Sequence, residues 1–424
     1  MENISYFCIM KMTRAIFYTI ILSLFFLNVN DIHASVGINN TDRTLDSVEV
    51  SLLTCSPHDE VYSLYGHTAI RFQDKKQGLD LAVNYGVFSF KKPYFVLRFV
   101  FGLTDYEMGI QNFEDFCMEY RYYGAKVTEQ VLNLTPEEKL AVYETLQKNS
   151  LPENRIYRYN YFYNNCTTKA RDVLLGNIRG KVVFNNKTDD SMSFRKLIHQ
   201  YNGDHPWARF GNDLLLGVKA DAKTTRDEQE FLPANLMTDF SHAVIIRGNT
   251  SVPLVKKTDT VVDATVQSDG NTGFCPTPTM CFAALLVVSL AVCIVERMTG
   301  KLFWGFDAIV VSLCGIAGLI LLAMVFSKHP TVSLNLQILL LNPLFLYGAY
   351  CLLRNRKDME RYKKTWNILA VFVIAACFCA LFQQFAEGMI ILALSLLLRW
   401  QAIFWHSKGS RICNIKKKGL SNEK

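Results

Sequence analysis

Five long apolar runs in the second half of the chain constrain its fold more than any other feature. They are Met280–Val295, Phe303–Phe326, Val332–Leu353, Trp366–Phe382 and Met389–Trp405. Each run comes near the roughly 20 residues that a helix needs to cross a bilayer, although the first is short unless residues 277–279 extend it. A soluble protein with buried helices is not expected to show five such runs separated by short polar gaps. The sequence therefore predicts a five-span transmembrane domain over residues 279–406.

The first 34 residues have the pattern of a secretory signal sequence. Lys11 and Arg14 precede the apolar run Ala15–Leu27, and a small residue, Ala34, stands at the expected cleavage point. An uncleaved anchor is the alternative, because Ile32 makes the cleavage site imperfect. In both cases the residues that follow are exported.

Residues 35–247 are predicted to form an exported α+β domain with an antiparallel sheet. Alternating apolar and polar residues indicate strands at Ser47–Leu52, His67–Phe72 and Leu81–Val87. The segment Thr135–Glu138 is a capping box with proline at the first helical position, and it begins a helix that runs to about Lys148. Further helices are expected from Cys166 and near Phe194 and Asp227. Residues 248–278 are rich in Thr, Asp, Gly, Ser and Pro and are predicted to be a linker.

The positive charge of the chain fits a membrane topology. The formal net charge is +7, from 45 Lys and Arg against 38 Asp and Glu. With the globular domain outside the cytoplasm, the basic loop 354–364 and the basic tail 407–424 both face inward, whereas the outward loop 383–388 has no Lys or Arg. The excess therefore records orientation in a membrane, and no nucleic-acid partner is expected.

A histidine and a cysteine carry the candidate chemistry of the exported domain. His67 lies in a predicted strand that is entered through Gly66, and Cys166 begins a predicted helix after an aromatic loop. Backbone N–H groups and the helix dipole at a helix N-terminus lower the pKa of a thiol, and a nearby imidazole activates it as a nucleophile. The same N–H groups, helped by Asn165, could hold an oxyanion. The alternative is that both residues are ordinary core residues.

Asn84 is the candidate third group. If the strands on either side of Lys75 and Lys76 pair symmetrically about that turn, residue 67 faces residue 84, and Asn84 can orient the ring of His67. A slip of one residue would move Asn84 to the other face of the sheet.

Other residues have two interpretations each. Cys55 could line the site or accept an acyl group, but it could also be a buried thiol or form a disulfide with Cys117. Arg155 and Arg158 could hold a lipid phosphate or pair with local carboxylates. Polar residues at membrane depth are functional candidates or hydrogen-bonding partners between helices; they are His329, Asn335, Gln337 and Asn342. No phosphate-binding glycine loop or metal-spaced histidine cluster occurs in the sequence, so no cofactor or metal is expected.

Several motifs in one order resemble a known family. They include Leu53–Pro57, Tyr65–Arg71, Asn84–Gly86, Phe99–Tyr106, Glu153–Arg155 and Tyr159–Asp172, and the resemblance continues through Pro206–Trp207, Phe231–Pro233, His329–Pro330 and Asn342–Leu344. The chain thus resembles, over nearly the whole mature length, the lipoprotein N-acyltransferase family of Bacteroidota, which is known by its Lnb N-terminal periplasmic domain.

The resemblance implies a fold and a set of roles. The exported domain of the family looks like a permuted papain-type fold, related to NlpC-type amidases and lecithin–retinol acyltransferases. By resemblance, Cys166 is the nucleophile and His67 the base. Arg71 lies in one of the shared motifs and joins Asn165, Arg155, Cys55 and His329 as a candidate for binding substrate.

These observations predict a membrane-anchored thiol acyltransferase at the outer face of the inner membrane. The resemblance implies a phospholipid as acyl donor and the N-terminal amine of a diacylated lipoprotein as acceptor, with an acyl-thioester on Cys166 between them. A periplasmic cysteine amidase or peptidase acting on peptidoglycan is the alternative enzyme. A non-catalytic membrane scaffold, in which the cysteine and histidine are structural, is the alternative of a different class.

Overall fold

The computed structural model describes residues 45–58, 60, 63–88, 93–265, 274–354 and 363–421, with side chains as far as residue 405. The predicted signal sequence, most of the basic loop and the basic tail's side chains lie outside the described residues. The chain forms two compact units. The first holds the described parts of 1–99, 103–188 and 225–275, and the second holds 100–102, 189–224 and 276–424.

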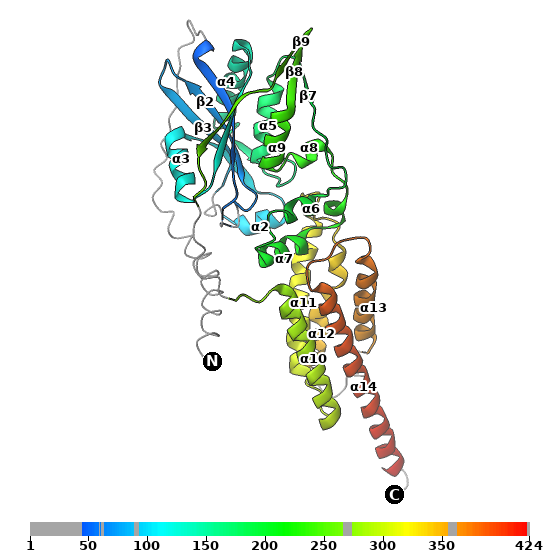
Figure 1. The fold of residues 1–424 in the computed structure, drawn as a ribbon. Helices are drawn as coiled ribbons and strands as arrows, with labels where there is room; N and C mark the ends of the chain where they lie inside the picture. The colour runs from blue at the N-terminus through cyan, green and yellow to red at the C-terminus, as the bar shows by residue number, and fades with distance from the viewer. Residues whose placement is uncertain are drawn as a thin grey trace. The chain divides into compact units, whose positions relative to one another are not determined.

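A seven-stranded antiparallel sheet is the centre of the first unit (Figure 1). Its strands follow the order β10-β5-β1-β2-β3-β4-β6, and every neighbouring pair is antiparallel. The strands are β1 (Val48–Cys55), β2 (His67–Asp74), β3 (Leu79–Val87), β4 (Asp105–Asn112), β5 (Val127–Leu132), β6 (Ile156–Arg158) and β10 (Val255–Val262). The predicted α+β class with an antiparallel sheet is confirmed, and the three predicted strands are β1, β2 and β3.

Helices cover both faces of this sheet. One face packs against α4 (Pro136–Ser150), α5 (Cys166–Gly176) and α9 (Pro233–His242), and the other packs against α3 (Phe113–Tyr122). The unit also contains α8 (Arg226–Gln229), most of α2 (Phe95–Val100), the 3-10 turn η1 (Leu45–Ser47) and a small sheet of β7 (Lys181–Phe184), β8 (Ala243–Arg247) and β9 (Thr250–Pro253). The predicted helices at 136 and 166 are α4 and α5, and the one near Asp227 is α8.

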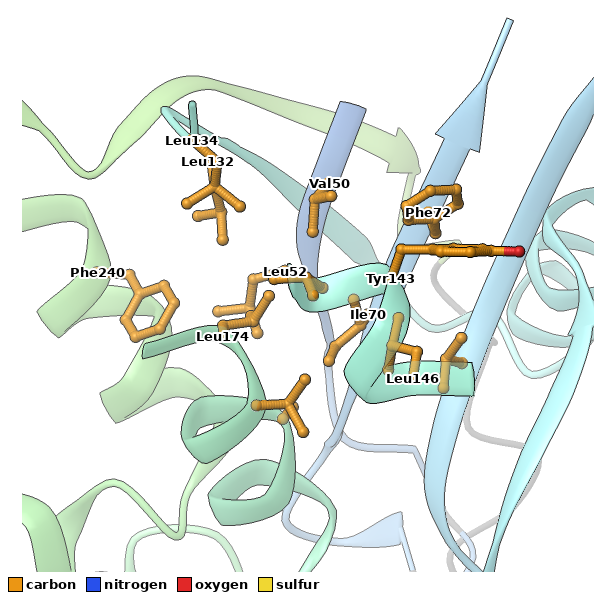
Figure 2. Packing of buried hydrophobic residues seen from close by; sticks show 14 of the residues in the cluster. Val50, Leu52, Ile70, Phe72, Leu132, Leu134, Tyr143, Leu146, Leu174 and Phe240 are labelled. Atoms are coloured by element: carbon orange, nitrogen blue, oxygen red, sulfur yellow. The ribbon is translucent and has the colours of Figure 1, made fainter. Parts of the chain in front are cut away.

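The central strands are buried on both faces. Leu52 and Ile70 point into the larger core, where Leu174 of α5 and Phe240 of α9 meet them (Figure 2). The next residue of β1, Leu53, belongs to the second core beneath α3. Complete burial of a leucine or isoleucine contributes about 1.5–3 kcal/mol, so these contacts hold β2 and α5 firmly together.

The predicted linker over 248–278 is wrong in its first half. β9 lies at Thr250–Pro253, and β10 pairs with β5 as the edge strand of the large sheet. The error has a physical cause, because half of the side chains of β10 are exposed, among them Lys256, Lys257 and Thr258. Charged residues on an exposed edge strand discourage pairing with other chains, but they also give the strand the composition of a loop.

The second unit contains the apolar helices. They are α10 (Pro278–Thr299), α11 (Trp304–Val325), α12 (Leu344–Arg354), α13 (Lys363–Cys379) and α14 (Met389–Ser421), with the 3-10 turn η4 (Leu336–Leu339) before α12. Within the described residues, three helices are long and apolar enough to cross a membrane, namely Pro278–Thr299, Trp304–Val325 and Leu336–Arg354, and Met389–Trp405 is a shorter apolar helix. The third predicted run is interrupted where Pro343, which has no N–H to donate, precedes α12.

Residues 189–224 belong to the second unit, although the sequence predicted them within the exported domain. They form α6 (Phe194–His199, the helix predicted near Phe194), α7 (Pro206–Leu215) and the 3-10 turn η3 (Val218–Asp221). The fully buried Arg195 pairs with Asp213 at 2.8 Å and with Asp221 at 2.6 Å. Gln337 of η4 then donates to the main-chain oxygen of Asp213 at 2.8 Å. Buried polar contacts of this kind, which a pattern of apolar residues does not reveal, join the segment to the membrane helices.

A second buried ionic cluster lies among the membrane helices. Arg399 of α14 donates to both carboxylate oxygens of Glu296 in α10 and of Asp307 in α11, at distances of 2.7–2.9 Å. All three side chains are almost completely buried. Charged groups inside a membrane domain are costly unless they are paired. The pairing with Arg399 therefore explains how an aspartate, Asp307, can be buried in the apolar helix α11.

Candidate active site

Strand β2 and helix α5 bring His67 and Cys166 together. His67 is the first residue of β2, and Gly66 before it has φ +77°. A Cβ on Gly66 would lie 2.5 Å from the main-chain oxygen of Cys55, so only glycine fits this entry to the strand. Cys166 is the first residue of α5. Thr68 donates its hydroxyl to that of Thr167 at 3.1 Å, which ties the strand to the helix beside the two residues.

The environment of Cys166 favours its thiolate. Burial raises the pKa of the thiol, but the charge and hydrogen bond of His67, a backbone hydrogen bond from Thr68 and the hydroxyl of Thr167 together lower it from 9.0 to about 7. Burial in turn lowers the pKa of His67, yet the charge and hydrogen bond of Cys166 and the hydrogen bond of Asn84 outweigh it, so this pKa is raised. The two shifts describe a thiolate–imidazolium pair near neutral pH.

Asn84 contacts His67 through a register that differs from the predicted one. The hairpin pairs Ala69, not His67, with Asn84, because its turn is centred one residue later than expected. This shift moves the partner by two residues and therefore keeps Asn84 on the same face as His67. The Oδ1 atom of Asn84 lies 3.0 Å from Nε2 of His67, which leaves Nδ1 as the ring nitrogen for the thiol.

The side chain of Asn165 is engaged in holding α5. Its Oδ1 accepts the N–H of Thr168 at 2.9 Å as the helix cap, and its Nδ2 donates to the main-chain oxygen of Phe231 at 2.8 Å. The residue is buried. These contacts make the side chain a structural cap of α5, and a role of Asn165 in holding an oxyanion stays a prediction.

The predicted substrate-binding arginines pair with carboxylates. Arg71 donates to Asp80 at 2.6 Å and to Glu129 at 2.9 Å, and its guanidinium lies over the ring of Phe113. Arg155 lies 3.8 Å from a carboxylate oxygen of Glu107. Arg71 therefore links strand β2 to β3 and to β5. The contact of Arg155 agrees with the second of its two interpretations, a local ion pair.

Cys55 is a buried thiol. It is the cross-strand neighbour of His67 in β1, and burial raises the pKa of its thiol despite a hydrogen bond with Tyr120. Cys55 and Cys117 are both free thiols, which agrees with the alternative of a buried thiol and not with the alternative of a disulfide. A protonated, buried thiol is inert, and this leaves Cys166 as the candidate nucleophile of the site.

His329 and its polar neighbours belong to the second unit. His329 follows α11, and its substrate role stays a prediction. Asn335 donates to the main-chain oxygen of Leu214 at 2.7 Å, and Gln383 donates to Oδ1 of Asn335 at 2.9 Å. The structure thus favours the hydrogen-bonding interpretation for Asn335, as it does for Gln337.

Tyrosines that the sequence analysis did not single out line the site. A Cβ at Gly86, whose φ is +86°, would lie 3.6 Å from Cβ of Cys166, 3.7 Å from Oη of Tyr157 and 3.4 Å from Cε2 of Tyr159. Tyr159 stacks on Tyr106 with ring centres 4.1 Å apart. Nothing in the local pattern marks Tyr157 as different from the other tyrosines of its aromatic loop, because its proximity to Cys166 depends on the pairing of β6 with β4.

Comparison with protein-family models gives two matches. Residues 39–200 match a model described as Lnb N-terminal periplasmic domain, and residues 269–410 match one described as Lnb transmembrane domain. The first range includes His67, Asn84 and Cys166. No curated protein and no solved structure matches the chain.

Proposed function

Because the chain belongs to the Lnb lipoprotein N-acyltransferase family, we propose that it is a membrane-bound acyltransferase that uses Cys166 as its nucleophile. The observation that carries the proposal is the arrangement of Cys166 at the N-terminus of α5, in contact with a histidine that Asn84 orients. The same three groups define the catalytic machinery of cysteine acyl-transfer enzymes in general: nucleophile, base and orienting residue.

The first half-reaction forms a thioester. The Sγ thiolate of Cys166 adds to the carbonyl carbon of a phospholipid ester, and the N–H groups at the start of α5 stabilise the developing oxyanion. The carbon–oxygen bond of the ester then breaks, and the imidazolium of His67 gives its proton to the departing lysolipid oxygen. The acyl chain remains on Cys166.

The second half-reaction transfers the acyl chain to nitrogen. The N-terminal amine of a diacylated lipoprotein adds to the thioester carbonyl while His67 takes the proton from that nitrogen. The carbon–sulfur bond breaks and leaves an amide on the lipoprotein, a thiolate on Cys166 and an imidazolium on His67. Dividing the transfer in this way replaces one difficult step with two easier ones.

A membrane domain suits these substrates, since both are lipids that arrive within the bilayer. We place the chain in the inner membrane with five passes, formed by α10, α11, η4 with α12, α13 and α14, and with the first unit in the periplasm. Three helices with the length and hydropathy of membrane spans support this topology. A permuted papain-like fold for the first unit rests on the family resemblance, and the antiparallel sheet with α5 packed against it is compatible with that fold.

Mass spectrometry of lipoprotein N-termini tests the function. Cells that depend on this chain are expected to lose the N-acyl mass when they carry Cys166→Ala, because no thioester can form. Cys275→Ser is the matched control, since Cys275 is an exposed cysteine of the same unit. Retention of N-acylation in Cys166→Ala cells that have no second such enzyme would refute the proposal. If the unchanged protein releases stem peptides from peptidoglycan, it is the alternative amidase. If it changes neither lipoproteins nor peptidoglycan, it is the alternative scaffold.

A further inference from the structure

The hydroxyl of Tyr157 is buried beside the candidate nucleophile and has no hydrogen-bond partner among the described residues. A buried hydroxyl without a partner costs about 1–3 kcal/mol, and such groups in native structures call for an explanation. The neighbouring Tyr85 makes the contrast clear, because its hydroxyl accepts a hydrogen bond from Asn149 at 2.8 Å. The two rings contact each other with centres 6.3 Å apart.

Three elements hold the ring of Tyr157 in position. The residue lies in β6, where it pairs with Tyr106 of β4. Its ring contacts those of Tyr85 and Tyr159, and Nζ of Lys169, one turn along α5 from Cys166, lies 4.9 Å from its centre. Contacts from β3, from α5 and from the segment after β6 leave the hydroxyl a narrow range of positions, so it is preorganised for a ligand.

The hydroxyl of Tyr157 also lies close to Cys166. The position that a Cβ of Gly86 would occupy is 3.7 Å from Oη of Tyr157 and 3.6 Å from Cβ of Cys166. Glycine leaves this position open, and each distance is an ordinary van der Waals contact. Oη of Tyr157 and Cβ of Cys166 therefore lie within 3.7 Å of one common point, and no side chain of residue 86 separates them.

The phenol is a donor throughout the working pH range. Burial raises the pKa of Tyr157, and the negative charge of the Cys166 thiolate raises it further. The group therefore keeps its proton where Cys166 has lost its own. A neutral O–H donor beside a thiolate is suited to bind a charge that develops on the substrate.

We propose that the Tyr157 hydroxyl donates a hydrogen bond to the substrate's carbonyl oxygen as Cys166 adds to the carbonyl carbon. This rests on the proposed acyl transfer and assigns one catalytic residue within it. When the carbon–sulfur bond forms, the carbonyl π electrons move to oxygen, and the O–H of Tyr157 stabilises that oxyanion together with the N–H groups of α5. When the carbon–oxygen bond breaks, the electrons return and the hydrogen bond weakens, so Tyr157 transfers no proton.

Two reactions of the same thiol test this role in the purified full-length protein. Acylation by an activated ester such as p-nitrophenyl butyrate passes through an oxyanion, whereas alkylation by iodoacetamide displaces iodide and forms none. Tyr157→Phe is expected to slow acylation of Cys166 about 10²-fold, as loss of an oxyanion donor does in other enzymes, and to leave alkylation unchanged. Tyr85→Phe is the matched control and is expected to leave both rates within about threefold, since the hydroxyl it loses already has a protein partner.

The outcomes are distinct. Unchanged acylation in Tyr157→Phe overturns the inference, and so does an equal slowing of acylation and alkylation, which identifies a structural role. Because the activated ester needs no lipid, this result is separate from the proposed function. If wild-type protein reacts with the ester and never takes an acyl chain from phospholipid vesicles, the lipid-transfer proposal fails while the role of Tyr157 is still decided.

Discussion

At the scale of single residues, the protonation of Cys166 and His67 determines when the site is reactive. The Cys166 pKa is lowered to about 7, so alkylation of this residue should rise with pH through that value. His67→Ala removes the charge and the hydrogen bond that lower the pKa but leaves burial, which raises it, and the midpoint should therefore move to a higher pH. Peptide-resolved mass spectrometry after brief iodoacetamide treatment measures it. A midpoint that stays the same in His67→Ala would show that the two side chains do not interact.

The rate of acyl transfer from a phospholipid should fall at high pH, whereas the rate of alkylation should not. The leaving oxygen needs a proton from His67, whose pKa is raised above 6.5 by the thiolate and by Asn84. Acyl transfer is therefore expected to rise through about pH 7 and to fall again where His67 loses its proton.

The residues of the site could be predicted to different degrees. His67 and Cys166 stood out because local signals mark them, a glycine before the strand and an aromatic loop before the helix. Asn84 was predicted to pair with His67, and it pairs with Ala69, two residues later. The prediction of its contact with His67 still holds, because side chains two residues apart in a strand lie on the same face of the sheet. Tyr157 had no local signal, since an unsatisfied hydroxyl is a property of the folded environment. Asn165 was assigned to chemistry although capping α5 uses its side chain.

At the scale of elements, Glu138 connects the start of α4 to the small sheet. It is completely buried, accepts the N–H of Thr135 at 2.8 Å in the capping box, and pairs with Arg247 of β8 at 2.6 Å. Glu138→Ala leaves Arg247 without its carboxylate and is expected to cost about 3–5 kcal/mol, the usual effect of breaking a buried pair. At ~2–4 °C per kcal/mol, the melting temperature of the full-length protein in detergent should fall by roughly 6–20 °C.

The matched control is the preceding residue of the same helix turn. Glu137 is exposed, so Glu137→Ala should leave the melting temperature close to that of the unchanged protein. Equal melting temperatures for the two variants in differential scanning fluorimetry would show that the buried contacts of Glu138 contribute little.

Elements with their own start signal were predicted best. The capping box places the start of α4 at its observed position, and the predicted end near Lys148 lies two residues before the observed one. Cys166 begins α5 as expected. β10 was missed because its exposed polar residues resemble a linker and its partner, β5, is more than 120 residues earlier in the chain. Local pattern thus identified the elements whose burial or caps are visible in sequence, and it failed for an edge strand whose stability comes from pairing.

At the scale of the whole molecule, composition separated a polar part from an apolar part but misplaced the boundary. The apolar runs gave the membrane helices, whereas residues 189–224 are as polar as the exported domain and yet pack within the second unit. What assigns them is a set of buried hydrogen bonds, including Gln383 to the main-chain oxygen of Leu216 at 3.0 Å. Such contacts come from single polar residues in or beside the apolar runs, and a hydropathy pattern does not show which groups they contact.

The fully buried Arg195 is therefore expected to hold residues 189–224 on the second unit. Arg195→Met removes its pairs with Asp213 and Asp221 and should cost about 3–5 kcal/mol of stability. Because all three residues lie within 189–224, this segment is the part of the protein that should be destabilised. Limited proteolysis of the full-length protein should then cleave within 189–224 at least about tenfold faster, because cleavage follows the population of the open form. Alkylation of Cys166, in the first unit, should be unchanged. Lys196→Met is the control, since Lys196 is the exposed next residue, and equal cleavage of both variants would mean that the buried ion pairs do not hold the segment.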